Sequence, residues 1–260
     1  MTFFDTHAHL DLPEFEANRA EVVARAVQAG VESILCVGIT ADSSQTSLQW
    51  AEQFGLVAAV GIHPNSTAEV GDGDWDRIVA MANHPRVVAL GETGLDRYWD
   101  HSPLSLQQDY FDRHLRLAQE RDLPVAIHCR DAQAELMPML RTAAARGPIR
   151  GIVHAFSGDA AMAAECIALG FYISFAGNVT YTNKKFEILR AAAKTIPPDR
   201  LLIETDSPFL VPQVFRGKLK FNEPAHVVHT ARFLADLRGV SLDEIAHQTT
   251  TNAKQLFRLP

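Results

Sequence analysis

The sequence predicts an α/β protein of the (β/α)8 type, a single TIM barrel. Short apolar runs alternate along the chain with stretches of helical periodicity, an order typical of parallel strands joined by crossover helices. Eight such units in 260 residues match the usual barrel size of about 250 residues. An open doubly wound sheet is the alternative, but no Gly-x-Gly-x-x-Gly motif follows the first apolar run. We therefore expect one domain over residues 1–260.

Each expected strand is an apolar run, and each is followed by a segment with helical periodicity. The strands are expected at 3–7, 31–37, 57–61, 87–90, 124–128, 151–154, 171–175 and 201–204. The helices are expected at 14–29, 42–54, 74–83, 104–121, 132–145, 159–169, 183–194, 223–238 and 241–252. The longest loops, 62–73, 92–103 and 206–222, follow strands three, four and eight. They are therefore expected at the C-terminal mouth of the barrel, where active sites form.

The composition indicates a soluble globular protein with a large core, because 47% of residues are hydrophobic and 21% are charged. No apolar run approaches the roughly 20 residues of a membrane span, and no signal peptide is recognisable. Cys36, Cys129 and Cys166 form no Cys-x-x-Cys pair, which favours reduced, buried thiols in a cytoplasmic protein. The net charge of −7 argues against coating of duplex DNA, but not against an enzyme with metals and a few local cations.

Metal-capable residues stand at the ends of six of the eight expected strands. They are His7 and His9 after strand one, His63 after strand three, Glu92 after strand four, His128 after strand five, His154 after strand six and Asp206 after strand eight. A barrel brings its strand ends into one ring, so these side chains should meet although they are far apart in sequence. One polar strand end is unremarkable, whereas six with metal-ligand chemistry predict a metal site.

Two divalent ions are expected in this site. Six candidate ligands, namely His7, His9, Glu92, His128, His154 and Asp206, suffice for two ions if one carboxylate bridges them. Glu92 has two oxygens and stands at the middle strand, so it is the expected bridge. Two ions about 3.5–4 Å apart can activate a water and neutralise charge on a phosphoryl oxygen. Nitrogen-rich ligation suits Zn²⁺ or Mn²⁺ better than Mg²⁺.

An ordered set of motifs covers nearly the whole chain and resembles the TatD family of amidohydrolase-like barrels. The motifs are Phe4-Asp5-Thr6-His7-Ala8-His9-Leu10, Gly61-Ile62-His63-Pro64, Gly91-Glu92-Thr93-Gly94-Leu95-Asp96, His128-Cys129-Arg130-Asp131-Ala132, His154-Ala155-Phe156-Ser157-Gly158, Glu204-Thr205-Asp206-Ser207-Pro208-Phe209-Leu210 and Asn222-Glu223-Pro224. The resemblance implies a metal-dependent deoxyribonuclease with exonuclease action from the 3′ end. The chain departs from the family pattern at Asn65, Arg97 and Phe221, in loops that face substrate.

The resemblance also implies roles for individual residues. His7, His9, Glu92 and Asp206 would hold one ion, and Glu92, His128 and His154 the second. Asp206 and Glu92 would be the catalytic carboxylates, with Asp206 accepting a proton from the attacking water. His63 is expected to contact a phosphate or substrate near the metals. The residues themselves, apart from the resemblance, suggest that Arg130 binds phosphate, the alternative being a buried ion pair. They also suggest that Glu204 and Asp96 support the ligands from outside; Glu204 could instead be an internal carboxylate with a partner, and Asp96 could contact Arg130 or a loop backbone, or simply form a turn.

Other charged residues have weaker implications. Cations in the mouth loops are expected to form a local cationic rim, made of Arg97, Lys184, Lys185, Arg216, Lys218 and Lys220. The remaining histidines are expected to have surface roles, namely His84, His101, His114, His226, His229 and His247.

The leading hypothesis is therefore a phosphodiesterase that hydrolyses DNA, most readily at a single-stranded 3′ end because a barrel mouth is narrow. The alternative is a small-molecule amidohydrolase or esterase, or an aminoacyl-tRNA deacylase, using the same metal pair; a non-enzymatic binding module is a third. A cationic groove leading to the metals would favour nucleic acid, and a closed apolar pocket a small ester or amide. No membrane partner is expected, and a monomer is favoured.

Overall fold

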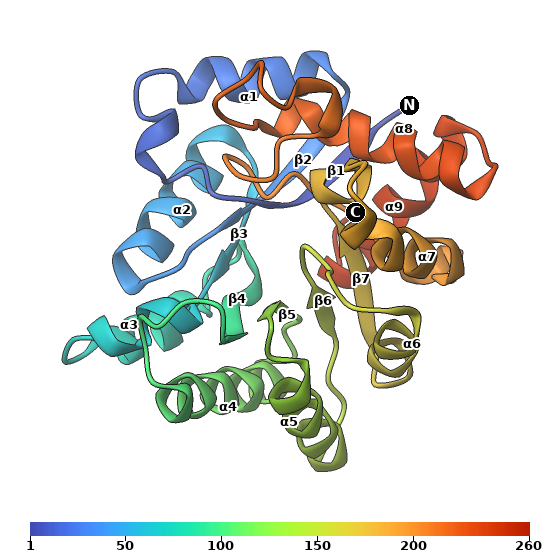
Figure 1. The fold of residues 1–260 in the computed structure, drawn as a ribbon. Helices are drawn as coiled ribbons and strands as arrows, with labels where there is room; N and C mark the ends of the chain where they lie inside the picture. The colour runs from blue at the N-terminus through green and yellow to red at the C-terminus, as the bar shows by residue number, and fades with distance from the viewer.

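Eight parallel strands form a nearly closed barrel surrounded by helices, as the sequence predicts (Figure 1). The computed structural model describes residues 1–260. Strands β1 to β8 are neighbours in chain order. The ring is closed by a parallel bridge between Ala8 and Ser207 and by a hydrogen bond from the Asp206 N–H to the His7 carbonyl. The chain is therefore a (β/α)8 TIM barrel.

The elements follow the alternating order expected of βαβ units. The strands are β1 (Phe3–Ala8), β2 (Val31–Val37), β3 (Val57–Val60), β4 (Val87–Asp96), β5 (Val125–Arg130), β6 (Gly151–Val153), β7 (Phe171–Phe175) and β8 (Leu201–Ile203). The α-helices are α1 (Arg19–Gln28), α2 (Ala41–Phe54), α3 (Asp74–Met81), α4 (Leu104–Arg121), α5 (Gln133–Arg146), α6 (Ala160–Ala168), α7 (Glu187–Thr195), α8 (Val227–Arg238) and α9 (Leu242–Phe257). Seven short 3-10 turns fill several of the connections.

Strand β4 is longer than predicted, because it runs to Asp96 instead of ending at Leu90. The sequence Gly91-Glu92-Thr93-Gly94 looks like a loop, yet it continues to pair with β5 as far as the Asp96–Arg130 pair. Gly94 makes this possible, because a Cβ there would collide with the His128 carbonyl oxygen. The extension places Glu92 inside a paired strand, where its position is fixed by the sheet.

Several helix bounds also differ from the prediction. The helices predicted at 14–29, 183–194 and 223–238 each begin as a 3-10 turn before the α-helix starts. The last helix ends at Phe257 instead of 252. The extra turn is stabilised by apolar burial, because Leu256 and Phe257 pack against the end of the barrel interior.

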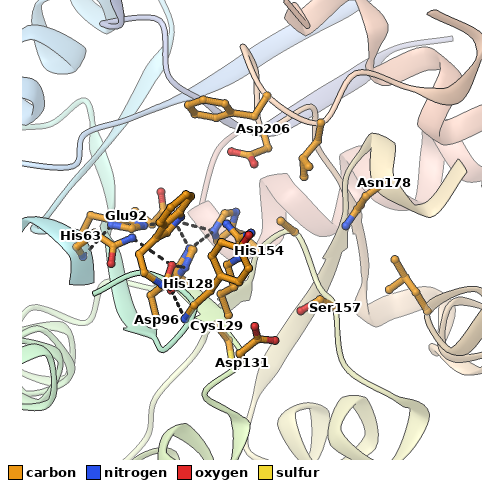
Figure 2. Close-up of a pocket in the computed structure, with 18 of the residues that line it drawn as sticks. His63, Glu92, Asp96, His128, Cys129, Asp131, His154, Ser157, Asn178 and Asp206 are labelled. Carbon is orange, nitrogen blue, oxygen red and sulfur yellow. Dashed lines mark hydrogen bonds and ion pairs between the residues drawn. The ribbon is translucent and has the colours of Figure 1, made fainter. Parts of the chain in front are cut away.

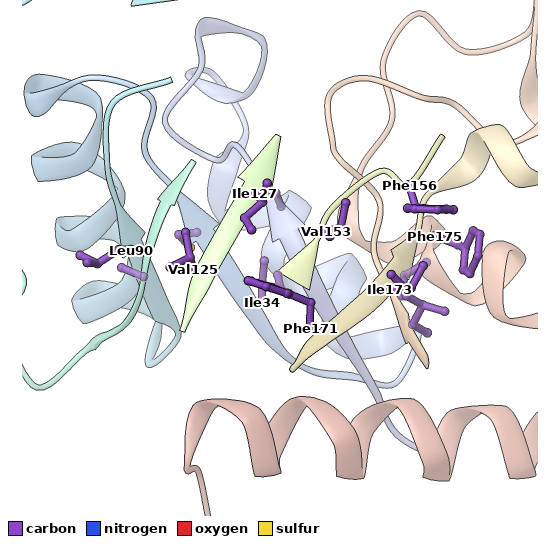
Figure 3. Close-up of a cluster of buried hydrophobic side chains, with 14 of the residues drawn as sticks. Ile34, Leu90, Val125, Ile127, Val153, Phe156, Phe171, Ile173 and Phe175 are labelled. Atoms are coloured by element: carbon purple, nitrogen blue, oxygen red, sulfur yellow. The ribbon is translucent and has the colours of Figure 1, made fainter. Parts of the chain in front are cut away.

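Two apolar clusters support the site. The larger lies between the strands and the outer helices, and Figure 3 shows part of it on β2, β4, β5, β6 and β7. The smaller lies inside the barrel and includes α9, with the Phe4 and Phe257 ring centroids 5.6 Å apart. Helix α9 therefore closes the N-terminal end of the barrel. The polar residues at the strand ends are left at the opposite, open end.

The prediction of a surface role for His114 was wrong, because this residue of α4 is fully buried. Its Nε2 accepts the Ile62 N–H at 3.1 Å and its Nδ1 lies 2.7 Å from the Tyr110 carbonyl oxygen. Burial lowers the pKa of His114 from 6.5 to about 4. His114 is thus a neutral histidine that holds the segment leading to His63.

The three cysteines form no disulfide. Cys36 and Cys166 are buried as predicted, whereas Cys129 is half-buried and lines the cavity at the barrel mouth. No helix of the structure is both long and apolar enough to cross a membrane.

Candidate metal centre

The predicted strand-end residues meet at the carboxyl ends of the strands, around a cavity of about 900 Å³ (Figure 2). His7 and Glu92 lie within β1 and β4, and His128 lies within β5. His154 and Asp206 follow β6 and β8. Three groups of side chains are close enough to hold a metal ion, with all ligand atoms of a group within 4.8 Å of one another.

The first group consists of His7, His9 and Asp206, all of them buried. The Nε2 atoms of His7 and His9 are 3.2 Å apart, and His9 Nε2 lies 3.5 Å from Asp206 Oδ1. Glu92 Oε2 lies 3.2 Å from His7 Nε2 and 3.4 Å from His9 Nε2. A tetrahedral ion with ligands at about 2.0 Å separates its ligand atoms by about 3.3 Å. These spacings fit such an ion.

Glu92, His128 and His154, the expected ligands of the second ion, meet at the other oxygen of Glu92. The second of the three groups contains Glu92 and His154 together with His7. Glu92 Oε1 lies 2.7 Å from His154 Nε2 and 2.8 Å from His128 Nδ1. The two histidine nitrogens are 3.4 Å apart. Glu92 thus connects the two groups through its two oxygens, the arrangement expected of a bridging carboxylate.

In His9 and His128, the ring nitrogen that faces away from Glu92 donates a hydrogen bond, and this bond determines which nitrogen carries the proton. His9 Nδ1 donates to the Val37 carbonyl at 3.0 Å, and His128 Nε2 donates to Asp96 Oδ2 at 2.9 Å. In the neutral ring the opposite nitrogen then carries a lone pair, which in both cases points at the carboxylate of Glu92. A lone pair facing a carboxylate is repulsive unless a proton or a metal ion lies between them, and a metal ion can take the place of that proton. The residues present therefore fit a divalent metal.

The electrostatics of the site favour positive charge at His9, His128 and His154. At His7 and His63 burial prevails and lowers the pKa. Burial opposes protonation of His9, but Asp206 and Glu92 outweigh it and raise the pKa of His9 to about 9. Burial likewise opposes charge on His154, yet Glu92 and Glu204 raise its pKa well above the usual range. Burial alone would raise the pKa of Glu92, but the surrounding histidines lower it far below its ordinary value. The carboxylates are thus held ionised, as metal ligands must be.

His63 joins Glu92 and His128 in the third group, although its own hydrogen bonds argue against ligation. The Asn65 N–H donates to His63 Nδ1 at 3.1 Å. The proton of the neutral ring is therefore on Nε2, which lies 3.4 Å from Glu92 Oε1. His63 presents an N–H donor to the centre, whereas His9 and His128 present lone pairs. An inward N–H suits an acceptor oxygen of a substrate better than a metal ion, and the substrate contact expected of His63 stays a prediction.

Two buried carboxylates hold the strand ends in place. Glu204 Oε1 accepts the Ala155 N–H at 2.5 Å and lies 3.4 Å from His154 Nδ1, as expected of a supporting group. Asp5, which the sequence analysis did not single out, accepts hydrogen bonds from the N–H and the hydroxyl of Thr205 at 2.8 and 2.5 Å. Asp5 thereby ties β1 to the segment that carries Asp206. Its position two residues before His7 was the available signal.

The predicted phosphate contact Arg130 lines the cavity, with its guanidinium 3.7 Å from the centre of the Tyr98 ring. It makes no ion pair, so its charge is available to a ligand. Asp96 contacts His128 and the backbone of the following loop instead of Arg130. The adjacent aromatic residues Tyr98 and Trp99 also line the cavity, and sequence reasoning missed their contribution.

Comparison with known proteins agrees with this architecture. The family model described as TatD related DNase matches residues 4–258. The chain is 41% identical to "Uncharacterized metal-dependent hydrolase YabD" of Bacillus subtilis, covering 98% of this chain and 99% of the relative. It is 36% identical to "3'-5' ssDNA/RNA exonuclease TatD" of Pectobacterium carotovorum, over 98% of this chain and 99% of that one. The crystal structure of YJJV, a TatD homolog from Escherichia coli, superposes with a TM-score of 0.91 at 33% identity, covering 99% and 98% of the two chains.

The barrel and its ring of histidines and carboxylates are those of a metal-dependent hydrolase. The chain belongs to the TatD family, because the family model spans nearly its whole length. The resemblance inferred from the motifs is thereby confirmed.

Proposed function

We propose that this protein is a deoxyribonuclease that hydrolyses phosphodiester bonds at the 3′ end of single-stranded DNA. The observation that carries the proposal is the pair of donor groups that share the two oxygens of Glu92. Paired ions of this kind suit an in-line displacement at phosphorus, because one charge can stabilise each of the entering and leaving oxygens. The name of the Pectobacterium relative, an exonuclease on ssDNA and RNA, supports the same substrate class.

Two divalent ions would be held by the residues already described. His7, His9 and Asp206 would hold one, His128 and His154 the other, and Glu92 would contribute an oxygen to each. When bound, such ions lower the pKa of a water molecule and polarise a phosphoryl oxygen. The nitrogen-rich donor set favours Zn²⁺ or Mn²⁺ over Mg²⁺.

The side chains around the ligands would bind and orient the substrate. Asp206 reaches the site from the β8 loop with its carboxylate ionised, so it can accept the proton of the attacking water. His63 can donate its Nε2 proton to a phosphate oxygen, and Arg130 can pair with the neighbouring phosphate.

The surface around the mouth favours a polyanion despite the net charge of −7. The segment 207–222, between β8 and α8, contains no Asp or Glu. Its cations Arg216, Lys218 and Lys220 are exposed and make no ion pair, as are Lys184 and Lys185 next to the cavity. Arg97 is the exception among the predicted rim residues, because it pairs with Glu135. Free cations beside an open cavity suit a nucleic-acid backbone.

The test is cleavage of a 3′-labelled single-stranded oligonucleotide by protein treated with EDTA and then supplied with Mg²⁺, Mn²⁺ or Zn²⁺. We expect cleavage that returns with metal and is lost in Asp206→Asn. The matched control is Asp131→Asn, because Asp131 also lines the cavity but is exposed and belongs to no donor group. Retained cleavage in Asp206→Asn would place the chemistry elsewhere. No cleavage by a protein shown to bind metal would move the assignment to carboxylic esters and amides, aminoacyl-tRNA included.

A further inference from the structure

We propose that Trp99, supported by Tyr98, is a stacking surface for a nucleobase of the bound strand, so that the site recognises a base as well as a phosphate. This inference rests on the proposed nuclease function and adds a specificity-determining residue to it. Aromatic rings bind bases through their faces, and every base has such a face. The recognition would therefore be tolerant of sequence but selective for nucleotides over simple phosphate esters.

The two rings are exposed within the functional cavity. Tyr98 is 54% exposed and Trp99 47% exposed, and both line the same cavity as Glu92 and His128. A large ring that remains half in water at the wall of a cavity is available to a planar ligand. The two rings meet edge to face, with centroids 4.9 Å apart and planes at 89°. Such a contact covers at most one face of one ring, and about half of each side chain remains exposed.

Asp96 links these rings to the metal ligands. Its Oδ1 accepts the N–H groups of Tyr98 and Trp99 at 2.9 and 3.1 Å. Its Oδ2 accepts the Nε2 proton of His128 at 2.9 Å. One buried carboxylate thus fixes both the ligand histidine and the backbone that carries the rings. A surface loop without a role in binding would not need this connection to the centre.

The charge next to the rings matches the rest of a nucleotide. The Arg130 guanidinium lies 3.7 Å from the centre of the Tyr98 ring and 5.7 Å from that of Trp99. His101 lies nearly parallel to Trp99, with centroids 5.4 Å apart and planes at 23°, which restricts the orientation of the indole. A cation for a phosphate and an oriented ring for a base therefore stand side by side. This combination fits a nucleotide better than an acyl chain, which would use neither.

The experiment compares two oligonucleotides, one normal and one with abasic residues in its three 3′-terminal positions, as substrates for native protein, Trp99→Leu and Trp99→Phe. Loss of one stacked base weakens binding about 5- to 150-fold. We expect Trp99→Leu to raise the KM for the normal strand within this range with kcat little changed. Trp99→Phe should remain near native. On the abasic strand, Trp99→Leu and native protein should have equal KM. Val27→Ala is the control, because Val27 is an exposed apolar residue of the outer helix α1 and does not line the cavity.

Binding can be measured independently of cleavage by tryptophan fluorescence in EDTA. The chain has three tryptophans, and Trp50 and Trp75 are less exposed than Trp99. The normal oligonucleotide should quench native fluorescence, and the abasic one should quench it much less. Trp99→Leu should show no quenching.

Two results would separate this inference from the function on which it rests. In the first result, the normal oligonucleotide is cleaved, but Trp99→Leu raises the KM equally for the normal and the abasic oligonucleotide, or leaves both KM values unchanged. The stacking role would then be wrong, and the nuclease assignment would stand. If neither strand is cleaved with any metal, the nuclease assignment fails and the stacking role fails with it.

Discussion

Substituting Asp96 with Asn should weaken metal binding without unfolding the protein. The carboxylate accepts the Nε2 proton of His128 at 2.9 Å, which leaves the Nδ1 lone pair facing the centre. Asparagine can keep its oxygen on the Tyr98 and Trp99 N–H groups, but its NH2 group would then face His128 Nε2. The imidazole would have to accept there and carry its proton on Nδ1, where a lone pair is needed to bind metal.

The expected loss is tenfold to a hundredfold in affinity for the ion that His128 would hold, because outer partners of ligand histidines typically contribute this much. That corresponds to about 1.4–2.8 kcal/mol of binding free energy. Titration calorimetry of the metal-free protein with Mn²⁺ or Zn²⁺ measures it directly, and thermal melting of the metal-free proteins checks the fold.

The matched control is Asn65→Ala, which removes the other hydrogen bond to Asp96 Oδ2, 3.1 Å long, and leaves the carboxylate on His128. Asn65→Ala should bind metal within a few-fold of the native protein. An Asp96→Asn protein that melts normally and binds both ions with native affinity would refute the tautomer argument. An equal loss in both variants would mean that loop order, and not the His128 proton, controls affinity.

Two further predictions concern charge. Burial lowers the pKa of His114 from 6.5 to about 4. Between these pH values the unfolded chain therefore binds a proton that the folded chain does not. The free energy of unfolding should decrease as the pH falls through this window, by about 2 kcal/mol at pH 5. His114→Gln keeps an acceptor for Ile62 and a donor for Tyr110 but does not titrate. Urea unfolding at pH 7.5 and pH 5 should therefore show a smaller loss of unfolding free energy in this variant than in the native protein. An equal loss would contradict the view that His114 is neutral in the folded protein. Neutralising Arg216, Lys218 and Lys220 to Gln should reduce the slope of log KM for an oligonucleotide against log salt by about 2, and an unchanged slope would exclude this segment as the path of the strand. The control for that triple variant carries the same charge change at exposed cations on the outer helices, Arg116, Lys194 and Arg232.

The sequence predicts the barrel and the residues that gather at its mouth, because both follow from recognising where each strand ends. Apolar runs are long enough to be recognised, and a closed parallel barrel converts the residue after each run into a neighbour of the others. His154 and Asp206, 52 positions apart in the chain, needed no contact information beyond this rule. The bounds of β4 were predicted less well, since the pairing that extends this strand depends on how closely β5 can approach Gly94.

Residues that act through backbone hydrogen bonds were harder to predict. Asp5 precedes the polar residues Thr6 and His7, and His114 lies among charged residues of a helix. Only the fold shows that their partners are Thr205 and Ile62. Trp99 follows a motif and looks like an ordinary loop residue. Its position at the cavity wall depends on the two hydrogen bonds that turn the loop around Asp96.

The role of each histidine depends on what its outer nitrogen contacts, and this is information the sequence does not contain. His63 and His128 both follow apolar runs of the sequence, and both place a nitrogen within 3.4 Å of Glu92 Oε1. His128 donates outward to a carboxylate and so turns a lone pair inward, whereas His63 accepts outward from a backbone N–H and so turns a proton inward. A lone pair can bind a metal ion, and an N–H can bind the oxygen of a substrate. The same residue type at equivalent strand ends is thus suited to two complementary functions.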